Sequence, residues 1–181
     1  MLAPVSVPVA SVNFHLGYSA EEDRLLLSVD VASAQEYAMA LTRRLAKALI
    51  AALVDRVSKD RADGLGDNPA LRDTVLSFEH ANAVAGAQAS GARRPRIEQK
   101  PLVAAPRLIR EIRMKATADG GVALQLDDHE RALNIELTPE RLHSFVAGVL
   151  DVASGAGWDL PAPAAWLDRA AAVARPAVVL H

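Results

Sequence analysis

The sequence predicts an α+β domain of duplicated βββα units, in which a mainly antiparallel sheet is covered by two long helices. Three observations predict this class. Apolar and polar residues alternate in two separate regions, each alternation gives way to an apolar repeat of three to four residues, and each change falls at a Leu-Thr step, Leu41-Thr42 and Leu137-Thr138. Alternation is typical of a strand with one buried face, and the longer repeat is typical of an amphipathic helix.

The chain of 181 residues is long enough for one domain with a sizeable core. We expect repeat halves at about 11–62 and 107–156, an inserted helix and a basic loop at about 68–106, and a C-terminal helix and tail at 158–181. Aromatic residues make up only 4% of the chain, so few large side chains are available to fill the core. We expect these to be Phe14, Phe78, Phe145, Trp158 and Trp166.

Three strands and a helix are expected in the first half. The alternating apolar positions are Val12, Phe14, Leu16 and Tyr18, then Leu25, Leu27, Val29 and Val31, then Tyr37, Met39 and Leu41. Thr42 is a good N-cap, and the apolar stripe that starts at Leu45 predicts a helix to about Arg61. Asn68-Pro69 predicts the start of the inserted helix, whose apolar positions are Leu71, Val75 and Phe78 and which fades after Ala83.

The second half repeats the pattern. The apolar positions are Leu108, Ile112, Met114 and Ala116, then Val122, Leu124 and Leu126, then Leu133, Ile135 and Leu137. Arg110 falls on the apolar side and marks a bulge or a strand end, and Asp119-Gly120 predicts a hairpin turn. Thr138-Pro139-Glu140 predicts a helix start. A short helix is expected around Ala164 to Val173.

The composition excludes several classes of protein. No cysteine is present, so disulfides, thiolate metal sites and cysteine nucleophiles are excluded. A secretory signal has a basic segment followed by an apolar one, and the N-terminus shows no such pattern. The longest apolar helical stretch, Leu45 to Val54, is too short to span a bilayer and contains Lys47. We therefore expect a cytoplasmic protein without a membrane segment.

No motif predicts a catalytic residue or a cofactor. Gly64 and Gly66 follow a helix rather than a strand, so they fit a helix end better than a phosphate-binding loop. Glu22 and Asp23 could carry out acid/base chemistry only in a pocket that excludes water. The sequence thus leans away from an enzyme.

Two polar groupings contain residue types that bind metal ions, but both fit an ordinary structural role better. Glu140 and His143 share one helix face at i, i+3 spacing, which also fits a solvated face. Asp127 to Glu130 lies between two alternating strands, as an ordinary polar hairpin tip would. His80, on the inserted helix, is expected to be hydrogen-bonded in the packing. No metal ligand is predicted.

A basic segment is the strongest functional signal. Between Arg93 and Lys115 eight basic residues stand against two acidic ones, a net charge of +6, so the rest of the chain carries −8. Arg43 and Arg44 are unusual at the positive end of a helix, where they could meet an anion or be offset by an acid such as Glu36. The candidates for nucleic-acid or anion binding are Arg43, Arg44, Arg93, Arg94, Arg96, Lys100, Arg113 and Lys115. The segment lacks the aromatic residues on which nucleic-acid bases stack.

Sheet–helix repeats of this kind resemble the single-strand-binding folds of the Whirly and Pur-alpha type. The resemblance is one of architecture and implies a curved sheet that carries the strand; those families have four strands per repeat, and none of their signature residues matches a position here. Two functions follow from the sequence. The preferred one is a non-enzymatic interaction or scaffold protein that acts as a homodimer, with a protein partner possible. The alternative is a single-stranded nucleic-acid-binding protein that uses the basic 93–115 segment.

Overall fold

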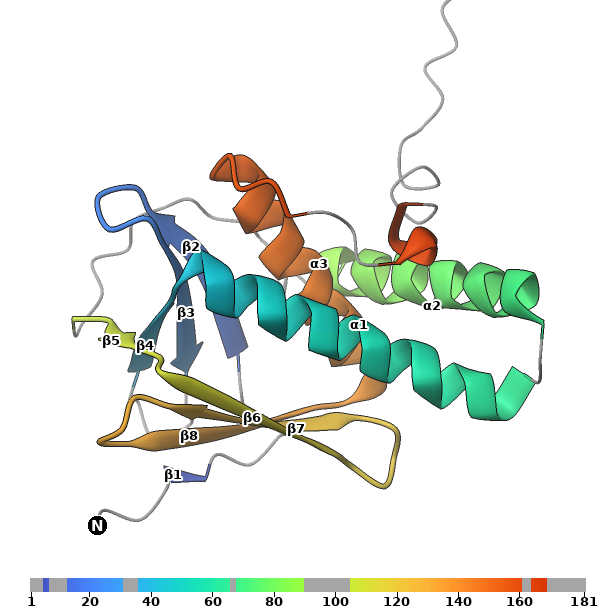
Figure 1. Ribbon diagram of the computed structural model, residues 1–181, viewed down its shortest axis with the longest axis horizontal. Helices are drawn as coiled ribbons and strands as arrows, with labels where there is room; N and C mark the ends of the chain where they lie inside the picture. The colour runs from blue at the N-terminus through green and yellow to red at the C-terminus, as the bar shows by residue number, and fades with distance from the viewer. Residues whose placement is uncertain are drawn as a thin grey trace, which may run out of the picture.

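The computed structural model describes residues 5–6, 13–30, 36–65, 68–89, 105–160 and 164–168. The expected α+β class is confirmed, with two mixed sheets and a group of helices beside them (Figure 1). The strands are β1 (Val5–Ser6), β2 (Asn13–Ser19), β3 (Arg24–Asp30), β4 (Glu36–Leu41), β5 (Arg107–Leu108), β6 (Glu111–Ala116), β7 (Val122–Asp127) and β8 (Ala132–Leu137). The helices are α1 (Arg43–Leu65), α2 (Pro69–Ala89) and α3 (Pro139–Gly155), followed by a helical turn at 165–168.

Each sheet consists of an antiparallel three-stranded meander and one short parallel edge strand. Sheet A has the order β1-β8-β7-β6, and sheet B has the order β2-β3-β4-β5. β5 pairs parallel with β4, and β1 pairs parallel with β8. These two-residue strands were not expected, because the alternation pattern predicts only the six longer strands. Each of them completes the sheet formed by the other half of the chain.

The chain passes from sheet B to sheet A within two residues. Ile109 N–H donates to the carbonyl of Ala40 in sheet B at 2.9 Å, and the next amide, that of Arg110, donates to the carbonyl of Asp127 in sheet A at 2.8 Å. Arg110 therefore marks the end of one strand and the approach to the next, which was one of the two expected explanations for its place in the pattern. Ile109 itself is buried at the junction.

Three side-chain caps begin the three helices where the sequence predicts them. The side-chain oxygens of Thr42, Asn68 and Thr138 accept hydrogen bonds from the amides of Leu45, Leu71 and Arg141, each three residues further along. α1 runs past the expected end to Leu65, and α2 continues through its alanine-rich part to Ala89. Of the C-terminal helix expected over 164–173, the structure describes a helical turn at 165–168.

The core lies between the sheets and the helices. On β3, β4, β7 and β8 the inward positions are those that the alternation predicts, and they include Leu25, Leu27, Val29, Met39, Leu41, Val122, Leu124, Leu126, Leu133, Ile135 and Leu137. On the edge strand β6 the expected apolar face is wrong, because Met114 is 38% exposed and Ala116 is exposed as well. α1 packs on β3, and α3 packs on β2 and β8. α2 packs against α1 and α3 on the side away from the sheets (Figure 1), so only one of its faces is covered by them.

Candidate functional site

The outer face of α2 is exposed and uncharged, and it carries two large apolar side chains. Leu71 is 47% exposed and Phe78 is 67% exposed. Phe78 was expected to fill the core, so this part of the prediction is wrong. We define the outer face by the exposed residues that follow one another at three- and four-residue spacing, namely Leu71, Thr74, Phe78, Asn82, Ala85 and Ala89. None of them carries a charge, and together they follow the helix for about 30 Å.

The inner face of α2 explains why Phe78 points outward. Leu76 is fully buried, and Ser77 and His80 are also buried although both are polar. The Ser77 hydroxyl is shared between the Asp73 carbonyl of its own helix at 2.8 Å and the Trp166 carbonyl at 3.0 Å. The Ser144 hydroxyl of α3 is likewise shared between the Glu140 carbonyl and the Ala83 carbonyl of α2, both at 3.2 Å. These contacts fix the rotation of α2 about its axis. The side chains opposite them must then face outward.

Three rings pack together under α2. His80 of α2, His143 of α3 and Trp166 of the helical turn form edge-to-face pairs with ring centroids 5.3–5.7 Å apart. The Nδ1 atoms of His80 and His143 are 3.3 Å apart, and both side chains are buried. His80 is therefore hydrogen-bonded in the packing, as expected. The expectation that Glu140 and His143 share a solvated face is wrong for His143, because α2 covers it.

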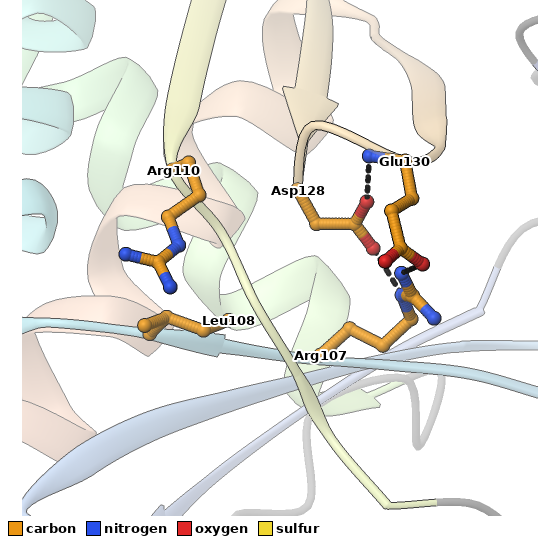
Figure 2. Close-up of a pocket in the computed structure, with 5 residues that line it drawn as sticks. All are labelled: Arg107, Leu108, Arg110, Asp128 and Glu130. Atoms are coloured by element: carbon orange, nitrogen blue, oxygen red, sulfur yellow. Dashed lines mark hydrogen bonds and ion pairs between the residues drawn. The ribbon is translucent and has the colours of Figure 1, made fainter. Parts of the chain in front are cut away.

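A shallow pocket lies where the two sheets meet (Figure 2). It has a volume of about 190 Å³ and is lined by Arg107, Leu108, Arg110, Asp128 and Glu130. The Arg107 guanidinium pairs with Asp128 and, at 2.5 Å, with Glu130. These two hydrogen bonds raise the pKa of Arg107 above its already high value. Because Arg107 is neutralised by two carboxylates, the pocket does not present its charge to an anion.

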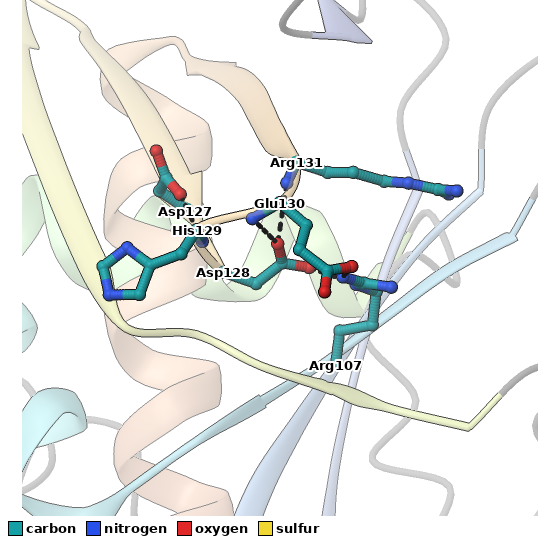
Figure 3. Close-up of polar contacts among 6 residues, drawn as sticks. All are labelled: Arg107, Asp127, Asp128, His129, Glu130 and Arg131. Carbon is teal, nitrogen blue, oxygen red and sulfur yellow. Dashed lines mark hydrogen bonds and ion pairs between the residues drawn. The ribbon is translucent and has the colours of Figure 1, made fainter. Parts of the chain in front are cut away.

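Asp128 is the central acceptor of the β7–β8 turn (Figure 3). One carboxylate oxygen accepts the amides of Glu130 at 2.8 Å and Arg131 at 2.7 Å, and the other accepts from Arg107. Burial acts to raise the pKa of Asp128, but the bond from Arg107 and the two amides outweigh it and lower the pKa to about 2. The turn also holds His129 at a φ of 75°. Asp128 therefore holds the turn in shape and ties β5 to it.

A second carboxylate joins the β2–β3 turn to the end of α3. Tyr18 Oη and Trp158 Nε1 both donate to Asp23 Oδ1 at 2.7 Å. The bond from Tyr18, followed by the one from Trp158, lowers the pKa of Asp23, and the charge of Arg43 lowers it further. The bond to Asp23, its charge and burial raise the pKa of Tyr18. Asp23 is thus occupied by hydrogen bonds and lies close enough to Arg43 to offset a cation at the start of α1.

The expected basic residues do not form one site within the described residues. Arg93, Arg94, Arg96 and Lys100 lie outside the described ranges. Arg43 and Arg44 are exposed at the start of α1, whereas Arg113 and Lys115 are exposed on the edge strand β6. The Arg113 guanidinium donates twice to Glu111 at 2.8 Å and once to Gln125 at 3.0 Å. Its charge is therefore partly compensated on the sheet itself.

The described ranges contain neither a cluster of metal-binding side chains nor a helix that could cross a membrane. No three His, Asp or Glu side chains there lie close enough together to hold a metal ion. None of the helices there combines the length and the apolar character that crossing a bilayer requires. Comparisons with protein-family models, with curated proteins and with solved structures found no match. Within the described residues, we therefore take the outer face of α2 as the candidate site.

Proposed function

We propose that this protein is a non-enzymatic interaction protein that acts as a homodimer in the cytoplasm, with the outer face of α2 as its contact surface. One observation carries the proposal: Phe78, the largest side chain on that face, is 67% exposed in the middle of a helix face without charge. A single exposed apolar residue is ordinary on a protein surface. A continuous uncharged face with two large apolar side chains is typical of a surface that binds another protein.

The chemistry of α2 favours a protein partner over a membrane. A helix that lies on a bilayer carries lysines and arginines on its polar side to meet the lipid headgroups. α2 has a single cation of that kind, Arg72, which is half-buried, and none in its second half. A phenylalanine on a face without charge fits the centre of a protein interface, which is enriched in aromatic residues and depleted of charge.

The single-stranded nucleic-acid alternative uses the basic 93–115 segment, with Arg93, Arg94, Arg96, Lys100, Arg113 and Lys115 as its candidate contacts. Within the described ranges, Arg107 and Arg113 are engaged with carboxylates, which weakens this alternative. Phosphate contacts make such binding fall steeply with salt concentration. Titration of a labelled oligonucleotide at low and at moderate salt would support it through a salt-dependent affinity, and the absence of binding at low salt would remove it.

We also propose that the two halves are copies of one βββα unit. β2, β3, β4 and α1 follow in the same order as β6, β7, β8 and α3, and threonine caps both helices. The third strand of each meander also pairs with a parallel two-residue strand that directly precedes the other meander in the chain. The two pairings, β5 with β4 and β1 with β8, are therefore equivalent in the two copies of the unit.

Light scattering coupled to size-exclusion chromatography tests the homodimer. The protein should elute with twice the 19.2 kDa mass of the chain. Phe78→Glu should reduce the mass to that of one chain, because a carboxylate would be buried without a partner at the interface. Its circular dichroism should stay unchanged, because the side chain does not contribute to the core of the protomer.

Ala51→Glu is the matched control, since it adds the same charge at an exposed position on α1. This variant should remain a dimer. A protein that is monomeric at all concentrations tested would overturn the proposal. A Phe78→Glu variant that remains dimeric would remove α2 as the contact surface.

A further inference from the structure

We infer that the partner of α2 is the α2 helix of a second copy, packed antiparallel about a two-fold axis that passes beside Phe78. The inference rests on the homodimer proposed above and specifies its geometry. In a two-fold pair, the contact surface of one copy must complement itself. The outer face of α2 meets this condition in the size, the polarity and the charge of its residues.

Side-chain size is complementary about Phe78. Leu71 and Ala85 each lie seven residues from Phe78, so an antiparallel pair places the leucine of one copy opposite the alanine of the other. This happens on both sides of the axis. The first half of the helix supplies the large side chain, and the second half supplies the space for it.

Polarity is matched in the same register. Thr74 and Asn82 each lie four residues from Phe78 and therefore face each other across the axis. The Thr74 hydroxyl donates to the Ala70 carbonyl at 2.8 Å, which leaves a lone pair on Oγ1 that can accept from the Asn82 amide. Both polar groups on the outer face would then have partners when water leaves the interface.

A parallel pair would lack this complementarity. It would place Leu71 against Leu71 and Ala85 against Ala85, so that one end of the contact is crowded and the other is empty. An antiparallel pair also sets the helix dipoles in opposite directions. Crossing at about 20° keeps two such helices in contact along their length, whereas the steeper crossing common in globular proteins separates them within two turns.

Charge does not oppose the pairing. The ionic side chains of α2 are Arg72, Asp73 and Glu79, and none of them belongs to the outer face. The outer face itself therefore brings no charge into the contact. This sets the outer face apart from the solvent face of α1, where Arg43, Arg44 and Lys47 are exposed.

The absence of cysteine allows a direct test, because every introduced thiol is the only one in its chain. Single variants Leu71→Cys, Ala85→Cys and Phe78→Cys would be treated with a bismaleimide that spans about 8–10 Å, the usual axis separation of packed helices. Phe78→Cys should cross-link alone. Leu71→Cys and Ala85→Cys should cross-link several-fold more when the two are mixed than when either is alone. Ala51→Cys on α1 is the control and should give only background.

The outcomes separate this inference from the homodimer itself. Strong cross-linking of Leu71→Cys alone would show a parallel pair and overturn the inference. A dimer by light scattering in which none of the α2 thiols cross-links would also overturn it, while the homodimer stands. A protein that is monomeric by light scattering would overturn both.

Discussion

At the scale of single residues, Asp128 is the side chain that connects the two sheets. Its carboxylate is 4% exposed, it accepts two turn amides, and it pairs with Arg107 of β5. The lowered pKa means that the folded protein favours the ionised form. The ionised Asp128 carboxylate therefore stabilises the folded protein. This stabilisation is fully present above the ordinary carboxyl pKa of about 4 and is lost as the pH falls toward 2.

Asp128→Asn should therefore destabilise the protein at pH 7 by about 1 kcal/mol, a value kept small because the partner Arg107 is 39% exposed and solvent screens the pair. Urea unfolding at pH 7, 5 and 3 measures the difference from the parent protein, which should shrink at pH 3. Asp55→Asn is the control, because it removes an exposed ion pair with Lys59 and should cost about 0.3–0.5 kcal/mol. A difference for Asp128→Asn that is constant between pH 7 and pH 3 would contradict the assignment.

Gly121 is the glycine whose missing side chain matters most to the β6–β7 hairpin. A β-carbon there would overlap the Leu137 carbonyl oxygen and lie 2.9 Å from Thr117 Oγ1. Gly121→Ala should lower the free energy of unfolding by about 1–3 kcal/mol, as overpacking usually does. Chemical denaturation measures this. Gly155→Ala, where a β-carbon meets nothing within 4 Å, should be neutral or slightly stabilising, and an equal loss in both variants would contradict the steric explanation.

Individual residues were predictable where the cause is local. The caps Thr42, Asn68 and Thr138 were predicted because a cap bonds to an amide only three residues away. Asp23 was not predicted as the neighbour of Arg43, because Trp158, which helps to hold it, comes from a distant part of the chain. Phe78 was placed in the core because its type is usually buried. Nothing in its neighbourhood in the sequence reveals that Ser77 and His80 take the inner positions.

At the scale of the elements, the packing of α2 on α3 depends on a histidine pair. Two Nδ1 atoms at 3.3 Å require that one of them donates and the other accepts. The accepting ring must then be neutral and carry its proton on Nε2. Nitrogen-15 NMR of histidine-labelled protein at neutral pH should show at least one buried imidazole in this tautomer. A spectrum in which both buried rings carry a proton on Nδ1 would contradict the hydrogen bond.

The positions of the strands and helices in the sequence were more predictable than which face of each helix is buried. Alternation and helical spacing predicted the six longer strands and the starts of the three helices. The end of α2 was misjudged, since its alanine-rich part offers little to pack but has high helix propensity. Which face of α2 is buried depends on α3 and on Trp166, and neither is visible from the periodicity of α2 alone.

At the scale of the whole molecule, a homodimer makes thermal stability depend on protein concentration. The melting temperature of the parent protein should rise as the concentration is increased, and that of Phe78→Glu should stay constant. Differential scanning calorimetry over a hundredfold range of concentration measures both. A parent protein whose melting temperature is independent of concentration would count against the homodimer and agree with a monomer by light scattering.

The sheet pairings could not be predicted from the sequence. β1 and β5 are two residues long, too short for any alternation to be recognised. Their partners are separated from them by more than sixty residues, because β5 pairs with β4 and β1 pairs with β8. Such pairings are decided by how the two halves meet in space. The sequence predicts each meander, and only the structure connects them.

The step between β5 and β6 links the two sheets directly through the backbone. Neighbouring amides at Ile109 and Arg110 belong to different sheets, although their Cα atoms are only about 3.8 Å apart. Twisting one sheet against the other would strain both hydrogen bonds at once. We therefore expect this junction to oppose rotation of one sheet relative to the other. We expect the two sheets to unfold together rather than one after the other.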